Sequence, residues 1–97
     1  MSDGVQIILP AVLLELADCA GELVVPIDGK AALLRTILDT AFVTRPLIGG
    51  RIRDETGGLR RHVNVFVDGQ DVRRRGGLDL LVRSGAVIHI LPSIAGG

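Results

Sequence analysis

The longest amphipathic helix pattern in the chain most constrains its fold. In DGKAALLRTILDTAF, apolar residues recur at the three- and four-residue spacing of one helical face: Leu33, Leu34, Ile37, Leu38, Ala41 and Phe42. Asp28 is a candidate N-cap, and Pro46 stops the helix, because the residue before a proline is pushed out of helical dihedrals. One such stripe covers one face of a sheet, so the other apolar segments are expected to supply strands.

Four further segments show the two-residue alternation of strands, namely residues 5–9, 23–27, 63–67 and 86–91. The third runs into Asp68-Gly69, a dipeptide suited to the positive φ angles of a tight hairpin turn. A short return strand is therefore expected around Val72. In the last strand, Ile88 and Ile90 share one face, opposite Val87, His89 and Leu91.

The connections are less regular. PAVLLELADCAGE is expected to form either a wide turn or a short helix over Leu13 to Ala17. IGGRIRDETGGLRR, residues 48–61, has the glycine-rich polar character of a long irregular connection, and GGLDLL, residues 76–81, predicts a helical turn.

These elements predict an α+β domain in which a mixed sheet packs against one main helix. A chain of 97 residues has room for one such domain, expected over residues 1–92. The sheet is expected to end at Pro92, because proline cannot donate to a strand ladder. Residues 93–97 are then expected to form a flexible tail.

Composition narrows the class of partner. The 11 basic and 11 acidic residues cancel, so no overall field attracts nucleic acid or an anionic membrane. The start MSDGVQIIL lacks the basic region of a signal peptide, and no apolar run reaches the length of a bilayer span. Cys19 is the only cysteine, which fits a reducing compartment. The sequence therefore predicts a cytoplasmic protein that binds neither nucleic acid nor membrane.

The sequence shows no recognisable grouping of catalytic or metal-binding residues. His62, His89 and Cys19 show no metal-ligand spacing and are expected to be structural. The glycine pairs at 49–50, 57–58 and 76–77 match no phosphate-binding loop and predict turns. The arginine runs at 60–61 and 73–75 predict a solvated face or, if they bind, contact with an acidic protein surface.

The chain ends in ILPSIAGG, with two glycines after Ala95. The five residues beyond Pro92 span about 15–18 Å when extended, enough to thread a partner's active site. Glycines lack Cβ atoms, so a narrow channel can close around the backbone while the terminal carboxylate meets the chemistry. A carboxylate becomes reactive as an acyl-phosphate or acyl-adenylate, from which a nucleophile can displace the leaving group.

The C-terminal third resembles a known family. The matching residues, as they stand here, are Val63-Asn64, Val67-Asp68, Asp71-Val72-Arg73, Gly76-Gly77-Leu78, Gly85, Ile90-Leu91-Pro92 and Ala95-Gly96-Gly97. With the order of elements, they resemble the ubiquitin-like β-grasp sulfur carriers of the MoaD and ThiS type, most closely the carrier used in thiocarboxylate-dependent cysteine biosynthesis. Over residues 1–60 the resemblance is one of topology, and LLELADCAG is more similar to the MoaD branch.

The resemblance implies a protein cosubstrate without catalytic residues, metal or bound cofactor of its own. An E1-like adenylyltransferase would use ATP to adenylate Gly97, and sulfide, a persulfide or a rhodanese-type donor would convert it to a thiocarboxylate. Gly96 and Ala95 would thread the channel. Phe66 and Pro92, with Arg73 and Arg75 at the rim, are the candidate docking residues.

The resemblance leaves the sulfur acceptor open among cysteine, molybdopterin, a thiazole and a specialised metabolite. Implied later partners are a sulfur-accepting synthase, for cysteine a pyridoxal-phosphate enzyme, and a metalloprotease that frees the product. One alternative is a ubiquitin-like modifier joined to lysines through its diglycine end. Another is an interaction module with an inert tail.

Overall fold

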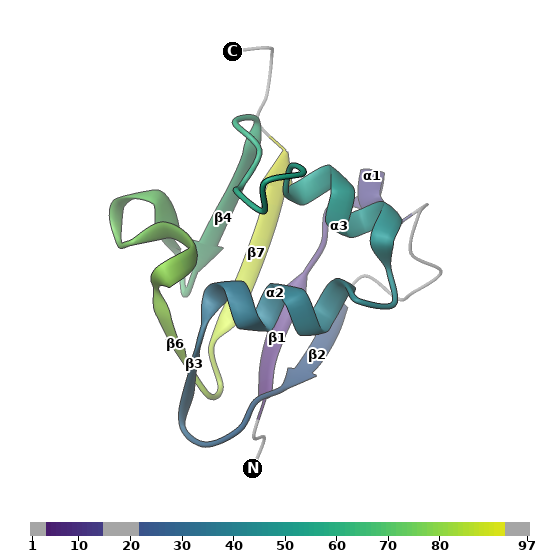
Figure 1. The fold of residues 1–97 in the computed structure, drawn as a ribbon. Helices are drawn as coiled ribbons and strands as arrows, with labels where there is room; N and C mark the ends of the chain where they lie inside the picture. Colours follow the sequence, from purple (N-terminus) through teal and green to yellow (C-terminus); the bar gives the residue numbers. More distant parts are fainter. Residues whose placement is uncertain (1–3, 15–21, 93–97) are drawn as a thin grey trace.

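The computed structural model describes residues 4–14 and 22–92. Five strands form one mixed sheet in the order β2-β1-β7-β4-β5, with β1 parallel to β7 and the other neighbours antiparallel (Figure 1). The strands are β1 (Gly4–Ile8), β2 (Glu22–Pro26), β4 (Val63–Val67), β5 (Gln70–Asp71) and β7 (Val87–Pro92). The expected α+β class is confirmed.

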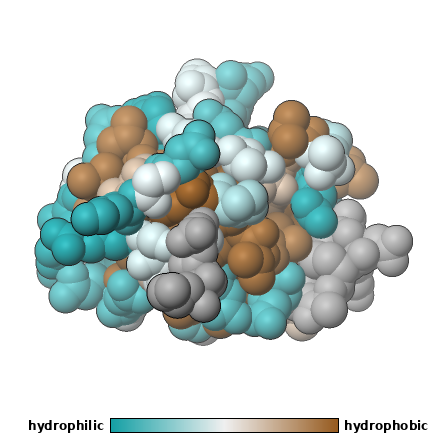
Figure 2. Space-filling model, turned by 90° about the horizontal axis from the view of Figure 1, so that it is seen from below, coloured by the Kyte–Doolittle hydropathy of each residue, from teal (hydrophilic) through white to brown (hydrophobic). Residues whose placement is uncertain are grey.

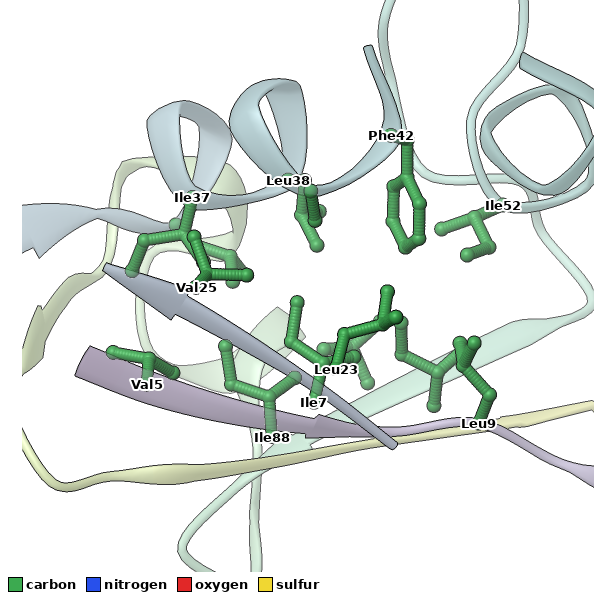
Figure 3. Close-up of a cluster of buried hydrophobic side chains, with 14 of the residues drawn as sticks. Val5, Ile7, Leu9, Leu23, Val25, Ile37, Leu38, Phe42, Ile52 and Ile88 are labelled. Carbon is green, nitrogen blue, oxygen red and sulfur yellow. The ribbon is translucent and has the colours of Figure 1, made fainter. Parts of the chain in front are cut away.

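Helix α2 (Leu34–Phe42) crosses one face of this sheet (Figure 1). Its buried side chains are the predicted stripe apart from Leu33, which is 39% exposed. In Figure 3, Ile37, Leu38 and Phe42 point from α2 toward Val5, Ile7, Leu9, Leu23, Val25 and Ile88 of the sheet and the residues next to it. The helical and strand periodicities thus meet in one aliphatic core, as the sequence predicts.

The start of α2 differs from the prediction. Asp28 does not cap it: the residue at the N-cap is Leu33, without a side-chain cap hydrogen bond. Residues Ala31–Leu33 form strand β3, which pairs antiparallel with β6 (Leu81–Arg83) in a second small sheet. The Leu34 amide donates to the Leu80 carbonyl at 2.9 Å, so a tertiary contact satisfies one helix-terminal N–H that a cap would otherwise take.

The segment predicted as a long irregular connection begins with a helix. Helix α3 (Pro46–Ile52) has Pro46 in its first turn, where a backbone N–H would have no partner within the helix. Pro46 therefore starts a helix, while α2 has already ended at Phe42. Gly49 and Gly50 lie inside α3, and the turn predicted for this pair is wrong. A Cβ on Gly49 would lie 3.2 Å from the Phe42 Cβ, so the glycine lets α3 approach α2 closely.

The predicted hairpin is confirmed. Asp68 and Gly69 both have positive φ, 49° and 85°, as a tight turn between β4 and β5 requires. The return strand is shorter than expected and ends at Asp71, because Val72 begins a 3₁₀ turn, η1 (Val72–Arg74). A second turn, η2 (Gly77–Asp79), confirms the predicted helical turn, but Leu81 belongs to β6 instead.

The N-terminal connection contains helix α1 (Ala11–Leu14), which starts earlier than the helix predicted at Leu13. Leu13 is buried at the end of the core, whereas Val12 is 60% exposed. The rest of that predicted helix and Cys19 lie outside the described residues, as do residues 93–97 with their predicted tail.

Candidate interaction site at the tail end of the sheet

The end of β7 fixes where the last five residues join the domain. Pro92 is the final residue of β7 and lies opposite Val63, the first residue of β4. Ala95, Gly96 and Gly97, predicted to thread a partner's channel, lie outside the described residues. Figure 1 shows this end of β7 on the opposite side of the molecule from the start of β1. We call the end of the sheet near Pro92 and Val63 the tail end.

Phe66 lies on the face of the sheet that α2 does not cover. Val63 and Val65 are buried against the core, so alternation places Phe66 on the other face, where it is partly exposed. His89 lies opposite Phe66 on one side and Ile8 on the other, forming a row across three strands. His89 is thus a strand-face residue, as predicted, and Phe66 belongs to a partly apolar surface about three residues from the tail end.

Arg73 is held against the backbone of the tail end. Its Nη1 donates to the Val63 carbonyl and its Nη2 to the Arg60 carbonyl, both at 2.6 Å. The Asp71 carboxylate accepts from the Arg73 amide at 2.9 Å and caps η1. The guanidinium therefore bridges two carbonyls just where the chain enters β4, a role that sequence alone did not indicate.

Arg75 lies elsewhere. It lines a hollow with Val67, Asp68, Leu81 and Arg83, at the end of β4 away from Val63. The structure therefore brings Arg73 and Pro92 to the same end of the sheet, with Phe66 farther along β4, and separates Arg75 from them.

Two hollows adjoin at the tail end. The first, of about 170 Å³, is mainly apolar and lies among α1, α3 and the ends of β4 and β7; it is lined by Pro10, Val12, Leu13, Arg51, His62, Val63, Ile90 and Leu91. The second, of about 450 Å³, is lined by Pro46, Leu47, Gly50, Arg51, Arg60 and His62. Arg51 and His62 line both. Sequence reasoning missed this surface because α3 was taken for a loop, although a proline ahead of an apolar segment signals a helix start.

The ion pairs of the described residues leave Arg51 on this surface without an acidic partner. Among residues 4–14 and 22–92, Arg35 pairs with Asp79 at 2.5 Å and Arg53 with Asp39 at 2.7 Å. Arg51 is in neither pair. Across the same residues, no cluster of three histidine, cysteine or acidic side chains has the arrangement of a metal site.

The loop after α3 contains a carboxylate with a shifted pKa. Asp54 accepts hydrogen bonds from the hydroxyl and amide of Thr56, at 2.5 and 2.9 Å, and from the Gly58 amide at 3.2 Å. These bonds, the Thr56 hydroxyl first, lower the pKa of Asp54 because they favour the charged carboxylate; the Arg60 charge contributes less. Asp54 thus organises the turn that leads back toward Arg60.

A family model describes nearly the whole chain: the ThiS family matches residues 7–97. The chain belongs to the ThiS family. The matched region contains most of the sheet, α2 and the diglycine, so the resemblance found in the C-terminal residues is confirmed and extends over the N-terminal half.

Relatives agree with this assignment. The sulfur carrier protein CysO of Mycobacterium bovis is 42% identical over 52 residues, which are 52% of this chain and 56% of that protein. The match thus spans about half the length of this curated relative. A chain in the crystal structure of the Amycolatopsis orientalis BexX/CysO complex has a TM-score of 0.81 and 30% identity, covering 96% of this chain and 99% of that one.

A second similar structure carries a different name. SAMP1 from Haloferax volcanii has a TM-score of 0.79 at 26% identity and covers 97% of this chain and 99% of its own. Together, these structures confirm the ubiquitin-like β-grasp fold. The described helices include none that is both long and apolar enough to span a bilayer.

Proposed function

We propose that this protein is a sulfur carrier whose Gly97 carboxylate is converted to a thiocarboxylate. The match to the ThiS family across residues 7–97, with Gly96-Gly97 at its end, is the observation that carries the proposal. The chain acts as a cosubstrate, and its partners supply the catalytic groups.

The proposed chemistry has two steps, adenylation of the carboxylate and displacement of AMP by a sulfur nucleophile. An E1-like enzyme joins the Gly97 carboxylate to the α-phosphate of ATP, releasing pyrophosphate and forming an acyl-adenylate. A sulfide or persulfide donor then attacks the acyl carbon and displaces AMP; a persulfide also needs a reductant or second thiol to release the sulfur. The thiocarboxylate sulfur is a better nucleophile than the carboxylate oxygen it replaces.

The tail geometry suits this role. Pro92 ends β7, the middle strand of the sheet, which lies between β1 and β4. The five residues after Pro92 therefore start from a rigid base. Their extended length of about 15–18 Å reaches an enclosed active site while the domain stays outside. A side chain at residue 96 or 97 would need a wider channel in the enzyme, which is why we propose a steric role for Gly96 and Gly97.

We favour cysteine biosynthesis as the destination of the sulfur, because the C-terminal residues most resemble the carrier of that pathway and the relative matched above is a sulfur carrier protein. The acceptor would then be a pyridoxal-phosphate synthase, with a metalloprotease releasing the product from the tail. A ubiquitin-like modifier is the second candidate function, favoured by the likeness to SAMP1. In that case a lysine amine, rather than sulfide, would attack the activated carboxyl group.

Intact mass of the protein purified from its own host tests the proposal. The same measurement after incubation with ATP, sulfide and that host's E1-like enzyme tests activation directly. We expect a gain equal to replacing one oxygen by sulfur, mapped to Gly97, which also requires Gly97 to end the mature chain. An unchanged mass together with lysine-linked adducts in the host would favour the modifier.

Gly97→Ala and Ser93→Ala form a matched pair for the steric role. Only the first places a Cβ at the reacting residue, so we expect slow thiocarboxylate formation for Gly97→Ala and normal formation for Ser93→Ala. Equal rates for both variants would contradict the steric role while leaving the carrier chemistry intact.

A further inference from the structure

The tail end carries a surface with a distinct chemical character, formed by the two adjoining hollows. Three apolar side chains border it while remaining largely solvent-accessible: Val12 is 60% exposed, Leu47 66% and Leu91 45%. Exposed aliphatic groups that gather beside a hollow are typical of a docking surface rather than of a solvated one.

The same surface is basic. Arg51 and His62 line both hollows, and Arg60 lines the second. Among the described residues that line either hollow, none is acidic. The Arg60 Nε donates to the Gly50 carbonyl at 2.8 Å, which ties the segment before β4 to α3 and keeps Arg60 on the same side of the tail end as Arg51. The complementary partner therefore presents carboxylates next to apolar side chains.

The surface differs from the sheet face that contains Phe66. It is built from α1, α3 and the segment entering β4, and Leu91 borders both. Because it lies beside Pro92, this surface is within reach of a protein that holds residues 93–97 in an active site. The opposite end of the molecule, seen in Figure 2, shows hydrophobic side chains in separate patches with hydrophilic residues between them.

We propose that these two hollows bind an acidic segment with apolar side chains on the enzyme that adenylates the tail. This inference rests on the proposed function, since it assigns the surface to the enzyme acting on Gly97. The apolar hollow takes aliphatic groups of that segment, and its carboxylates face Arg51 and Arg60. Opposite charges beside the channel raise the rate of encounter and align the tail with its entrance.

Matched substitutions at the two ends of the molecule test the proposal. Leu47→Ser and Arg51→Glu alter the surface on α3, while Leu81→Ser and Arg83→Glu make the same changes on β6, where Leu81 is 60% exposed and Arg83 is also exposed. The readout is pyrophosphate release by the host's E1-like enzyme at varied carrier concentration and salt, with a thermal melt to show that each variant folds.

We expect Arg51→Glu to raise KM about tenfold and Leu47→Ser about threefold to fivefold, with kcat nearly unchanged, because the substitutions weaken docking rather than chemistry. The wild-type KM should rise with salt, and Arg51→Glu should lose much of that dependence. The β6 variants should stay within about twofold of the wild type.

Each other outcome is decisive. Equal effects of the α3 and β6 pairs, with normal activation of the wild type, would overturn this surface and leave the sulfur-carrier function standing. A wild-type dimer in sedimentation that Arg51→Glu dissociates would assign the surface to a second copy of the chain and overturn the enzyme as occupant. Failure of the wild type to be activated would overturn the proposed function and this inference with it.

Discussion

Arg73→Ala is expected to destabilise the domain by removing the bridge between η1 and the entry to β4. The Arg73 guanidinium donates two 2.6 Å hydrogen bonds, to the carbonyls of Arg60 and Val63. A hydrogen bond from a charged donor contributes about 1.5–3 kcal/mol when water is excluded. Because Arg73 is exposed, water can replace it at both carbonyls, and we expect a total loss of about 1–2 kcal/mol in the free energy of unfolding.

For a domain of this size, that loss lowers Tm by about 5–15 °C. Thermal and urea unfolding followed by circular dichroism measure it without any partner, which separates this structural role from the docking role predicted for Arg73. Arg74→Ala is the matched control, since this neighbouring exposed side chain donates no hydrogen bond to the carbonyls that Arg73 bridges. Its effect should stay within about 0.5 kcal/mol. Arg73→Lys should fall between them, because an ammonium cannot fork to both carbonyls. Equal Tm values for Arg73→Ala and Arg74→Ala would refute the bridge.

Two further predictions concern α3 and the loop after it. Gly50→Ala should stabilise the domain by up to about 1 kcal/mol, because Gly50 lies in a helix and a Cβ there would meet open space. Gly49→Ala should stabilise it less, since its Cβ would lie 3.2 Å from the Phe42 Cβ. A larger gain for Gly49→Ala in urea unfolding would contradict the packing argument. Asp54→Asn should cost stability near neutral pH but little in strong acid. The folded state lowers the pKa of Asp54, so its contribution is present above the unfolded pKa and is lost as pH falls through the folded one. Unfolding at both pH values checks this, and a cost that does not shrink in acid would show that the charge of Asp54 is not involved.

The sheet and its helix follow from patterns that sequence carries locally. Alternating valines before Asp68-Gly69 require a hairpin because this dipeptide tolerates the two positive φ values that the turn needs. The stripe from Leu34 to Phe42 requires a helix lying on an apolar surface. Both signals come from residues a few positions apart, which is why the fold class and the burial of most of these side chains could be predicted.

The errors arose where partners lie far apart in sequence. Ala31–Leu33 is extended because it pairs with Leu81–Arg83, and the start of α2 is fixed by the Leu80 carbonyl rather than by Asp28. Two adjacent glycines normally disfavour a helix, since each costs about 1 kcal/mol relative to alanine. In α3 this cost is offset by packing, as Ile48 and Ile52 are buried and Gly49 allows close contact with α2.

The sequence by itself determined the fold class, the aliphatic core, the family and the diglycine on which the proposed chemistry depends. These properties follow from composition, from short-range periodicity and from a motif of residues close together in the sequence. Tertiary structure alone decided what surrounds the exit of that tail: it brought Val12, Arg51, His62 and Leu91 to one surface and tied Arg73 to the backbone beside Val63. Such a surface depends on how helices and strand ends pack around the core, and no local pattern of residues specifies that arrangement.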